Sequence, residues 1–327
     1  MIYLARRKGK YGHFGVISMD VATLGIVCAD VMVRPIESFP ERGKLSHVPQ
    51  LEIHLGGLAG VTATVLSQLG AKSAFIGCTG TDGFGDYLMG VMKSQGVDVS
   101  RVRRTSEYGS SATVVLVSND GERTFIHHMG ANRLVSEQDV DFDFVSQARV
   151  LHWGGPSVNP GLDGEPIGRV LEQARGRGMV TSMDTCFDGQ GKWFQLIKHA
   201  LPHLDIVMSS LEEARHYTGK KEPDEIADFY RSFGVETVLV KLGADGVFAK
   251  NSTEQHRLPA HNVKVVDTTG AGDAACGGFL YGYVQGWGLL DCAKLANAVG
   301  GLTVQRMGGA EAVRSLEQVK AFMEDGQ

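Results

Sequence analysis

A glycine-rich run near the C-terminal end of the chain has the residue types and spacing to bind an anion beside an acid–base group. It reads DTTGAGDAACGGF from residue 267 to residue 279. We expect a strand over 262–266 and a helix after Gly270, where small and apolar residues recur at helical spacing. The first N–H groups of such a helix have no partner within it and point, with its dipole, toward a bound anion. The sequence therefore predicts an anion hole at Gly270, Ala271 and Gly272.

Asp273 places a carboxylate in the same turn. Phosphoryl transfer to an alcohol needs a group that accepts the hydroxyl proton, donors that hold the migrating charge and a metal that screens the phosphates. We predict that Asp273 is the catalytic base. The turn also satisfies the relaxed dinucleotide pattern G-x-G-x-x-A, but a pyrophosphate bound there would be repelled by the Asp273 carboxylate. The P-loop pattern G-x-x-x-x-G-K-[ST] does not occur in the sequence.

The run resembles the C-terminal signature of the ribokinase-like (PfkB) carbohydrate kinase family, in which the final Asp is the catalytic base and the preceding backbone forms the anion hole. Residues 56–85, GGLAGVTATVLSQLGAKSAFIGCTGTDGFG, resemble the N-terminal signature of that family. Residues 25–30, GIVCAD, resemble its opening strand, whose terminal Asp hydrogen-bonds sugar hydroxyls. The resemblance implies a kinase that uses ATP and Mg²⁺ to phosphorylate a sugar-like small molecule.

On the acceptor side, the resemblance nominates Asp30, Gly56 and Gly57 as substrate-binding residues. We expect Asp30 to end an apolar strand, where α/β sheets place groups that contact ligands. The two glycines precede a helix and would let the backbone approach the substrate. Five positions after Gly56, where the family commonly has a sugar-contacting Asn, this chain has Val61, so we expect a methyl surface in the pocket and no ribose-specific contact there.

On the nucleotide side, KLGADG resembles the family's T-x-G-x-x-G turn along the nucleotide, with Lys241 in place of Thr. A cation there either pairs with a phosphate or points to solvent. Glu213 matches the Glu of an N-x-x-E motif that arranges Mg²⁺ and phosphate through water, although Ser210 replaces the Asn. The resemblance implies the following residues: for ATP, Lys241, Gly243, Gly246 and Asn297; for the metal, Glu213 and Asp184.

Other cation sites have weaker signals. The backbone over 267–269 and the loop near Gly308 match the place where some relatives bind a monovalent cation. His127 and His128 are adjacent, so on a strand they would face opposite sides and could not form a metal pair. We expect no structural zinc site.

The elements that must position these residues follow a regular order. Short β-branched runs alternate with helical patterns from Val21 onward, which favours βαβ units and a mainly parallel sheet. With the resemblance, this predicts an α/β, ribokinase-like three-layer α/β/α fold. Two stretches break the order, about residues 31–55 and 108–130, the second with a hairpin pattern. We expect them to form a small β-sheet lid; edge strands of the main sheet are the alternative. Residues 1–18 would be an accessory extension and 19–327 the kinase domain.

The composition limits the partners. The net charge of −5, without a block of like charges, argues against nucleic acid or an anionic membrane surface. No apolar run is long enough to predict a membrane span. Five scattered cysteines are typical of reduced thiols in the cytoplasm. The exposed face of the predicted lid is a candidate homodimer interface.

Two further functions remain open at this stage. Relatives on this framework also phosphorylate nucleosides, so a nucleoside kinase is an alternative. A different class is a sugar-binding regulatory protein with weak or lost turnover, against which the retained Asp273 argues. The sequence specifies neither the sugar nor the hydroxyl that is phosphorylated.

Overall fold

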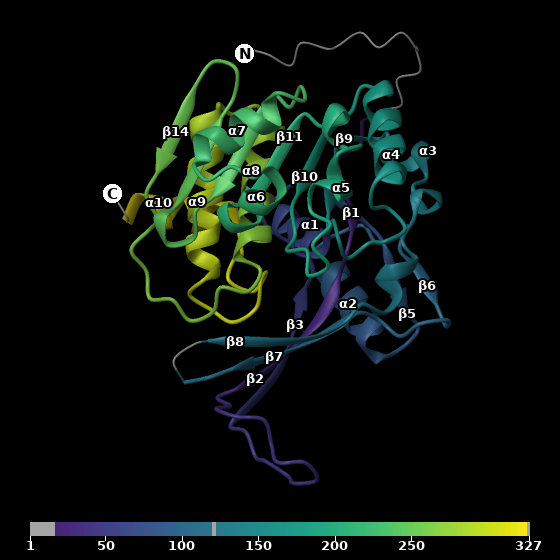
Figure 1. The fold of residues 1–327 in the computed structure, drawn as a ribbon, viewed down its shortest axis with the longest axis vertical. Helices are drawn as coiled ribbons and strands as arrows, with labels where there is room; N and C mark the ends of the chain where they lie inside the picture. Colours follow the sequence, from purple (N-terminus) through teal and green to yellow (C-terminus); the bar gives the residue numbers. More distant parts are fainter. Residues whose placement is uncertain (1–16, 120–121, 326–327) are drawn as a thin grey trace.

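A computed structural model describes residues 17–119 and 122–325 and is built around an eight-stranded sheet (Figure 1). The strand order is β14-β13-β12-β11-β10-β9-β1-β4, parallel from β4 to β12 with two antiparallel strands at the other edge. These strands are β1 (Met19–Gly25), β4 (Ser73–Ile76), β9 (Ala148–Gly154), β10 (Val180–Asp184), β11 (Ile206–Ser210), β12 (Thr237–Lys241), β13 (Val247–Lys250) and β14 (Gln255–Leu258).

Helices cover both faces of this sheet because successive strand residues are apolar on both sides. Val21 and Val150 enter one buried cluster, and the next residues, Ala22 and Leu151, enter the other. The first cluster is covered by α1 (Leu58–Gln68), α2 (Gly83–Ser94), α8 (Ala271–Val284), α9 (Leu289–Thr303) and α10 (Leu316–Asp325). The second is covered by α3 (Phe142–Val145), α4 (Glu165–Gly176), α5 (Phe194–Ile197), α6 (Leu211–Thr218) and α7 (Pro223–Arg231). The predicted three-layer fold is confirmed.

A second sheet of four strands lies apart from the main one, at the carboxyl ends of its strands (Figure 1). Its order is β3-β2-β7-β8, and its strands are β2 (Cys28–Arg34), β3 (Gln50–Gly56), β7 (Ala112–Val117) and β8 (Arg123–His128). The predicted hairpin is present as the antiparallel pair β7–β8. A further short pair joins β5 (Cys78–Gly80) and β6 (Arg103–Thr105). The irregular stretches therefore form a separate small sheet, as expected, and are not edge strands of the main one.

The expected strand over 262–266 is wrong. Val265 and Val266 are exposed, and the N–H groups of Val266 and Asp267 donate to the carbonyl of Val304 at the end of α9. The edge of the main sheet is already occupied by β14, so this β-branched segment packs on a helix end as an extended loop. Of the predicted extension 1–18, residues 1–16 lie outside the described part of the chain, and the first strand begins at Met19.

Small residues set the position of α8, the helix that follows the glycine-rich turn. A Cβ on Gly277 would lie 2.9 Å from Cγ1 of Val65 in α1, and a Cβ on Gly278 would lie 3.1 Å from the Leu295 carbonyl oxygen in α9. The helix can therefore pack closely against both neighbours only with glycine at these two positions.

A substitution at Gly278 tests this packing. Gly278→Leu should destabilise the fold by about 1–3 kcal/mol or more, because the side chain would push the backbone of α9 away. A Cβ on Gly90 of α2 would have no described atom within 4 Å, so Gly90→Ala is the matched control and should stabilise the helix by about 0.5–1 kcal/mol. Chemical denaturation measures both values, and equal effects of the two variants would refute the packing role.

Candidate active site

Two charged side chains and a thiol converge where β10, β12 and the start of α8 meet. Nζ of Lys241 lies 2.6 Å from Oδ1 of Asp184 and 3.5 Å from Sγ of Cys276. Asp184 is fully buried and Lys241 is turned inward, with 12% of its side chain exposed. A Cβ on Gly272 would lie 3.2 Å from the same Nζ, so the ammonium group is beside the predicted anion hole. Two orientations of Lys241 were expected from the sequence, toward a phosphate or toward solvent. The second of these is wrong.

The turn before α8 has the conformation that an anion hole requires. Gly270 is the N-cap, with a left-handed φ of 71°, and a Cβ on it would lie 2.5 Å from Cα of Gly309. The first helical bond runs from the N–H of Ala274 to the carbonyl of Gly270. The N–H groups of the first turn, including those of Gly272 and Asp273, lie before that bond and point out of the helix end.

The surroundings of Asp273 favour its protonated form. Burial and the neighbouring carboxylates of Asp184 and Glu213 raise the pKa of Asp273 to about 8, although Lys241 acts in the opposite direction. Burial opposes the charge of Lys241, but the surrounding acidic groups, Asp184 first, raise its pKa above the ordinary value. A carboxyl whose pKa lies near the working pH is suited to proton transfer.

Glu213 lies at the start of α6, next to this cluster. Its N–H and carboxylate form a reciprocal capping box with Ser210, and Oε2 accepts a hydrogen bond from the Thr185 hydroxyl at 2.8 Å. Oδ2 of Asp184 is buried without a hydrogen-bond partner among the described residues. No group of three or more His, Cys, Asp or Glu side chains in the described chain is arranged to hold a metal directly. Any role of Asp184 and Glu213 toward Mg²⁺ would therefore involve water or phosphate oxygens as further ligands.

The remaining nucleotide-side candidates lie in connecting segments. Gly243 begins a 3-10 turn after β12, and Gly246, with φ 92°, ends it; a Cβ on Gly246 would lie 2.0 Å from the Leu258 carbonyl oxygen. Asn297 of α9 donates from Nδ2 to the Pro259 carbonyl at 2.7 Å. These residues shape and tether the loop that leaves β14.

Asp30 does not end a strand of the main sheet, contrary to the prediction. β1 ends at Gly25, and Asp30 lies inside β2 of the second sheet. The connection over 26–27 is held on three sides: Ile26 bonds through its N–H to Gly154 and through its carbonyl to Gly60, and the Val27 carbonyl accepts from Nδ2 of Asn132. The sequence gives no sign of this break between β1 and β2, because the residues before and after it are all buried and the run 21–27 is apolar almost throughout.

Buried polar contacts fix the Asp30 carboxylate. Sγ of Cys28 donates to Oδ1 at 3.0 Å, and Oγ1 of Thr113 lies 3.7 Å from that Sγ. Burial raises the pKa of Asp30 to about 6, against the effect of Cys28 and Thr113. The charge of Asp30 in turn raises the pKa of Asp273 further.

The two glycines before α1 serve the protein's own packing. A Cβ on Gly56 would lie 2.0 Å from Oδ2 of Asp30, and one on Gly57, whose φ is 89°, would lie 2.7 Å from Cα of Val27. The expectation for Val61 is wrong: it is fully buried and lies beneath Gly309, so it presents no methyl surface to a pocket. Gly56 thus makes room for the Asp30 carboxylate, and Gly57 for the backbone at Val27.

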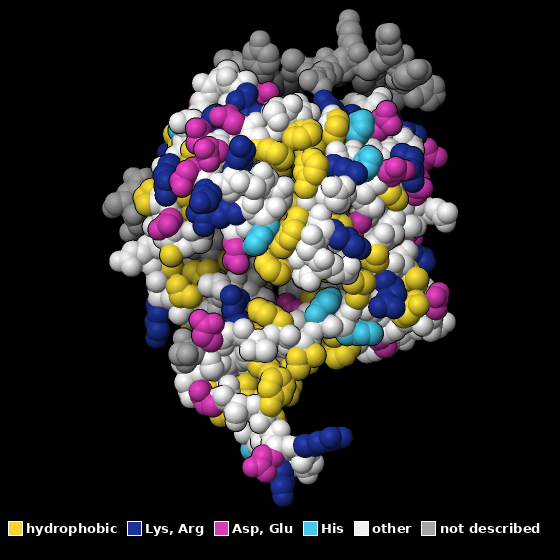
Figure 2. Space-filling model, viewed as in Figure 1, with side chains coloured by type: hydrophobic (Ala, Val, Ile, Leu, Met, Phe, Trp, Pro, Cys, Tyr) yellow, Lys and Arg dark blue, Asp and Glu magenta, His cyan; other side chains and the backbone are white. Residues whose placement is uncertain are grey.

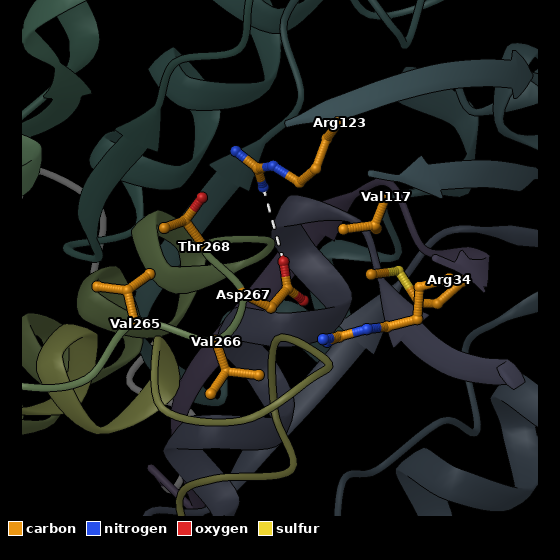
Figure 3. Close-up of a pocket in the computed structure, with 8 residues that line it drawn as sticks. Arg34, Val117, Arg123, Val265, Val266, Asp267 and Thr268 are labelled. Carbon is orange, nitrogen blue, oxygen red and sulfur yellow. Dashed lines mark ion pairs between the residues drawn. The ribbon is translucent and has the colours of Figure 1, made fainter. Parts of the chain in front are cut away.

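A cavity of about 240 Å³ lies between the second sheet and the segment before the glycine-rich turn (Figure 3). Arg123 of β8 reaches across it, with Nη1 3.0 Å from Oγ1 of Thr269 and 3.7 Å from Oδ1 of Asp267. Oδ2 of Asp267 accepts from the N–H of Gly308 at 3.3 Å, so the two segments matched to a monovalent-cation site do adjoin. Arg123 was not predicted as a site residue, although strand alternation from the hairpin turn would have placed it on the inner face of the second sheet.

Comparison with known proteins agrees with this geometry. The sequence model of the pfkB family carbohydrate kinases matches residues 19–316. The chain belongs to this family. The kinase is 28% identical to 2-dehydro-3-deoxygluconokinase of Bacillus subtilis, covering 86% of this chain and 90% of the relative, and 28% identical to aminoimidazole riboside kinase of Salmonella typhimurium, covering 82% and 87%. It also has the fold of Arabidopsis thaliana ribokinase complexed with ribose and ATP (TM-score 0.81, 24% identity, covering 94% and 99%). Equal identity to kinases named for different acceptors leaves the acceptor unspecified.

The raised pKa of Asp30 makes this residue a source of pH-dependent instability. Because its pKa rises from 3.8 to about 6 on folding, the ionised carboxylate costs the folded state about 3 kcal/mol once the pH is well above 6. Stability from this group is fully present below pH 3.8 and is lost as the pH rises through 6. Asp30→Asn should therefore stabilise the kinase by about 1–3 kcal/mol at pH 8 and by little at pH 4.5. Urea unfolding at both pH values measures the difference, and an equal effect at the two would contradict this origin.

Proposed function

We propose that this kinase transfers the γ-phosphoryl group of ATP to a hydroxyl of a sugar or sugar-like molecule, with Asp273 as the general base. The observation that carries the proposal is the placement of the Asp273 carboxylate, the outward-pointing N–H groups of the same helix turn and the inward Lys241 ammonium around one point. Phosphoryl transfer needs this combination of proton acceptor and positive field.

The chain's own residues can divide the chemistry as follows. Asp30 and its neighbours bind the acceptor, and Asp273 takes the proton of the attacking hydroxyl as its oxygen bonds to the γ-phosphorus. The bond from that phosphorus to the bridging oxygen breaks and ADP leaves. The N–H groups of Gly270 and Gly272, with Lys241, hold the charge of the migrating group, and the N–H of Ala271, which donates to the Thr268 carbonyl at 3.4 Å, would have to turn toward it. Gly243, Gly246 and Asn297 support the nucleotide-side loop.

The fit of a divalent metal is supported by Oδ2 of Asp184, which has no partner among the described residues, and by the Glu213 carboxylate, since the charges of both act on Asp273. Carboxylate and phosphate oxygens are the ligands that Mg²⁺ prefers, usually with several waters. Bound Mg²⁺ would screen the phosphates and, by its charge, lower the pKa of Asp273 into the range of a working base. A monovalent cation at the Asp267–Gly308 segments stays a prediction.

No helix in the described part of the chain is long and apolar enough to cross a membrane. All five cysteines are free, which suits a reducing compartment, and we propose the cytoplasm.

A panel of sugars, sugar acids, polyols and nucleosides scored for ADP release tests the activity. Nucleosides as the best acceptors would favour the nucleoside kinase, whereas sugar binding without ADP release would favour a regulatory protein.

The outer face of the second sheet supports a homodimer. Directly opposed residues Ile53, Val31, Val114 and Ile126 form an apolar row across all four strands, and Ile126 and Leu51 are at least half exposed. Figure 2 shows hydrophobic side chains gathered over the part of the molecule where this sheet lies in Figure 1. The sheet's other face is turned to the active site, so a second copy of the chain is the occupant that we propose for the outer face.

Asp273→Asn tests the base. The change keeps size and hydrogen-bonding capacity but removes the proton acceptor, so kcat should fall by about 10²- to 10⁴-fold with little change in acceptor or ATP binding. Single-turnover transfer with the best acceptor measures the rate. Asp291→Asn, on the exposed face of α9, is the control and should keep the wild-type rate. A folded Asp273→Asn enzyme within about threefold of wild type would exclude the assignment.

Ile126→Lys tests the dimer. A charge in the middle of the apolar row should convert dimers to monomers, because its burial would be uncompensated. Ile17→Lys, a comparable change at an exposed apolar residue outside the sheet, should leave the assembly intact. Analytical ultracentrifugation separates the outcomes; wild-type protein that sediments as a monomer at micromolar concentration would rule out the interface.

A further inference from the structure

Four side chains of the second sheet form one polar row across all of its strands. Asp30 of β2 lies directly opposite His54 of β3 and Thr113 of β7, and Thr113 lies opposite His127 of β8. Directly opposed residues point to the same face of a sheet, so all four share the face of Asp30. That face is turned toward the segment before α8, because Arg123, which shares a face of β8 with His127, lies 3.0 Å from Oγ1 of Thr269. His127 is therefore on the active-site side, and His128 is on the outer side.

The hydrogen bonds of this row fix the tautomer of His127. Oγ1 of Thr113 lies 3.0 Å from Nδ1 of His127 and 3.7 Å from Sγ of Cys28, whose thiol donates to the Asp30 carboxylate. The single thiol proton of Cys28 goes to the carboxylate, so Sγ accepts the hydroxyl proton of Thr113, and Thr113 must accept from Nδ1–H of His127. Partial burial by its neighbours and the nearby His128 lower the pKa of His127, which favours the neutral ring. Its Nε2 then carries a lone pair and no proton.

The lone pair of His127 is available, unlike the ring nitrogens of His54. Nδ1 and Nε2 of His54 are both engaged, by Glu311 and Glu52 at 3.0 Å each. His127 is exposed, and within the described residues its Nε2 has no partner. The row thus presents two acceptors, the Asp30 carboxylate, whose Oδ1 already accepts from Cys28, and the unpartnered Nε2 of His127, with Thr113 between them.

We propose that His127 is a specificity-determining residue whose Nε2 accepts a hydrogen bond from a hydroxyl of the acceptor substrate, so that this end of the site selects an uncharged polyhydroxylated group over a carboxylate. The proposal rests on the proposed kinase function. Hydroxyls can donate to both acceptors, whereas a substrate carboxylate would meet a lone pair and the charge of Asp30 without a donor between them. Asp30 and His127 are two strand spacings apart, about 10 Å between backbones, so the acceptor must carry hydroxyls on separate carbons.

His127→Asn tests this inference directly. The Asn amide can replace Nδ1 toward Thr113 but cannot reach the position of Nε2. The KM for the acceptor should rise roughly tenfold, the value of one lost hydrogen bond of about 1.4 kcal/mol, while kcat changes by less than about twofold. His127→Gln, whose amide oxygen reaches toward Nε2, should restore part of the affinity. His128→Asn, one residue along on the opposite face, is the control and should behave as wild type.

Two measurements keep this test separate from that of the kinase function. Calorimetric titration of the acceptor without ATP measures binding alone, and a neutral sugar should bind less tightly to His127→Asn even if no turnover is found. Paired acceptors, an aldose or polyol against the corresponding aldonic acid, measure selectivity. Unchanged affinity in folded His127→Asn, or preference of the wild type for the aldonic acid, would overturn the inference. Absence of ADP release with every acceptor would instead refute the proposed function.

Discussion

The buried pair of Lys241 and Asp184 is the interaction on which the candidate active site depends. Parallel strands β10 and β12 flank β11 and end at the same edge, which brings their last side chains together in the interior. Removing one member of such a pair leaves an uncompensated buried charge and costs about 3–5 kcal/mol. The ammonium also offsets the charges of Glu213 and Asp273, so three carboxylates can share one region. Gly272 leaves the space beside Nζ open, which joins the charge cluster to the start of α8.

The second sheet completes the site from the opposite side because its two faces differ. The inner face carries Asp30 and Arg123, one directed to the acceptor region and the other to the segment before α8. The outer face is apolar across all four strands. An apolar sheet face that stays exposed to water is typical of a surface that binds another protein. Catalysis and assembly can thus be encoded by alternate residues of the same strands.

The sequence was sufficient for the elements whose patterns are local. The alternation of strands and helices, the hairpin of β7 and β8 and the turn at Gly270 all follow from spacing and turn chemistry. The expected strand over 262–266 was wrong because tertiary packing decided between a sheet edge and a helix end. Asp30 was assigned to the wrong strand because a buried break between two strands has no polar or glycine signal beyond Gly25. Partners of Lys241 and Arg123 come from segments distant in the chain, and no local pattern specifies them.

The short connection at Ile26 and Val27 has a consequence for how a substrate is received. Hydrogen bonds from three separate segments hold these two residues. The start of β2 therefore cannot rotate without breaking several of these bonds at once. Asp30, three residues after Val27, is therefore held close to this connection, whereas β8 lies at an edge of the sheet, further from it. An acceptor that reaches Asp30 would therefore meet a carboxylate whose position is set by the protein before binding.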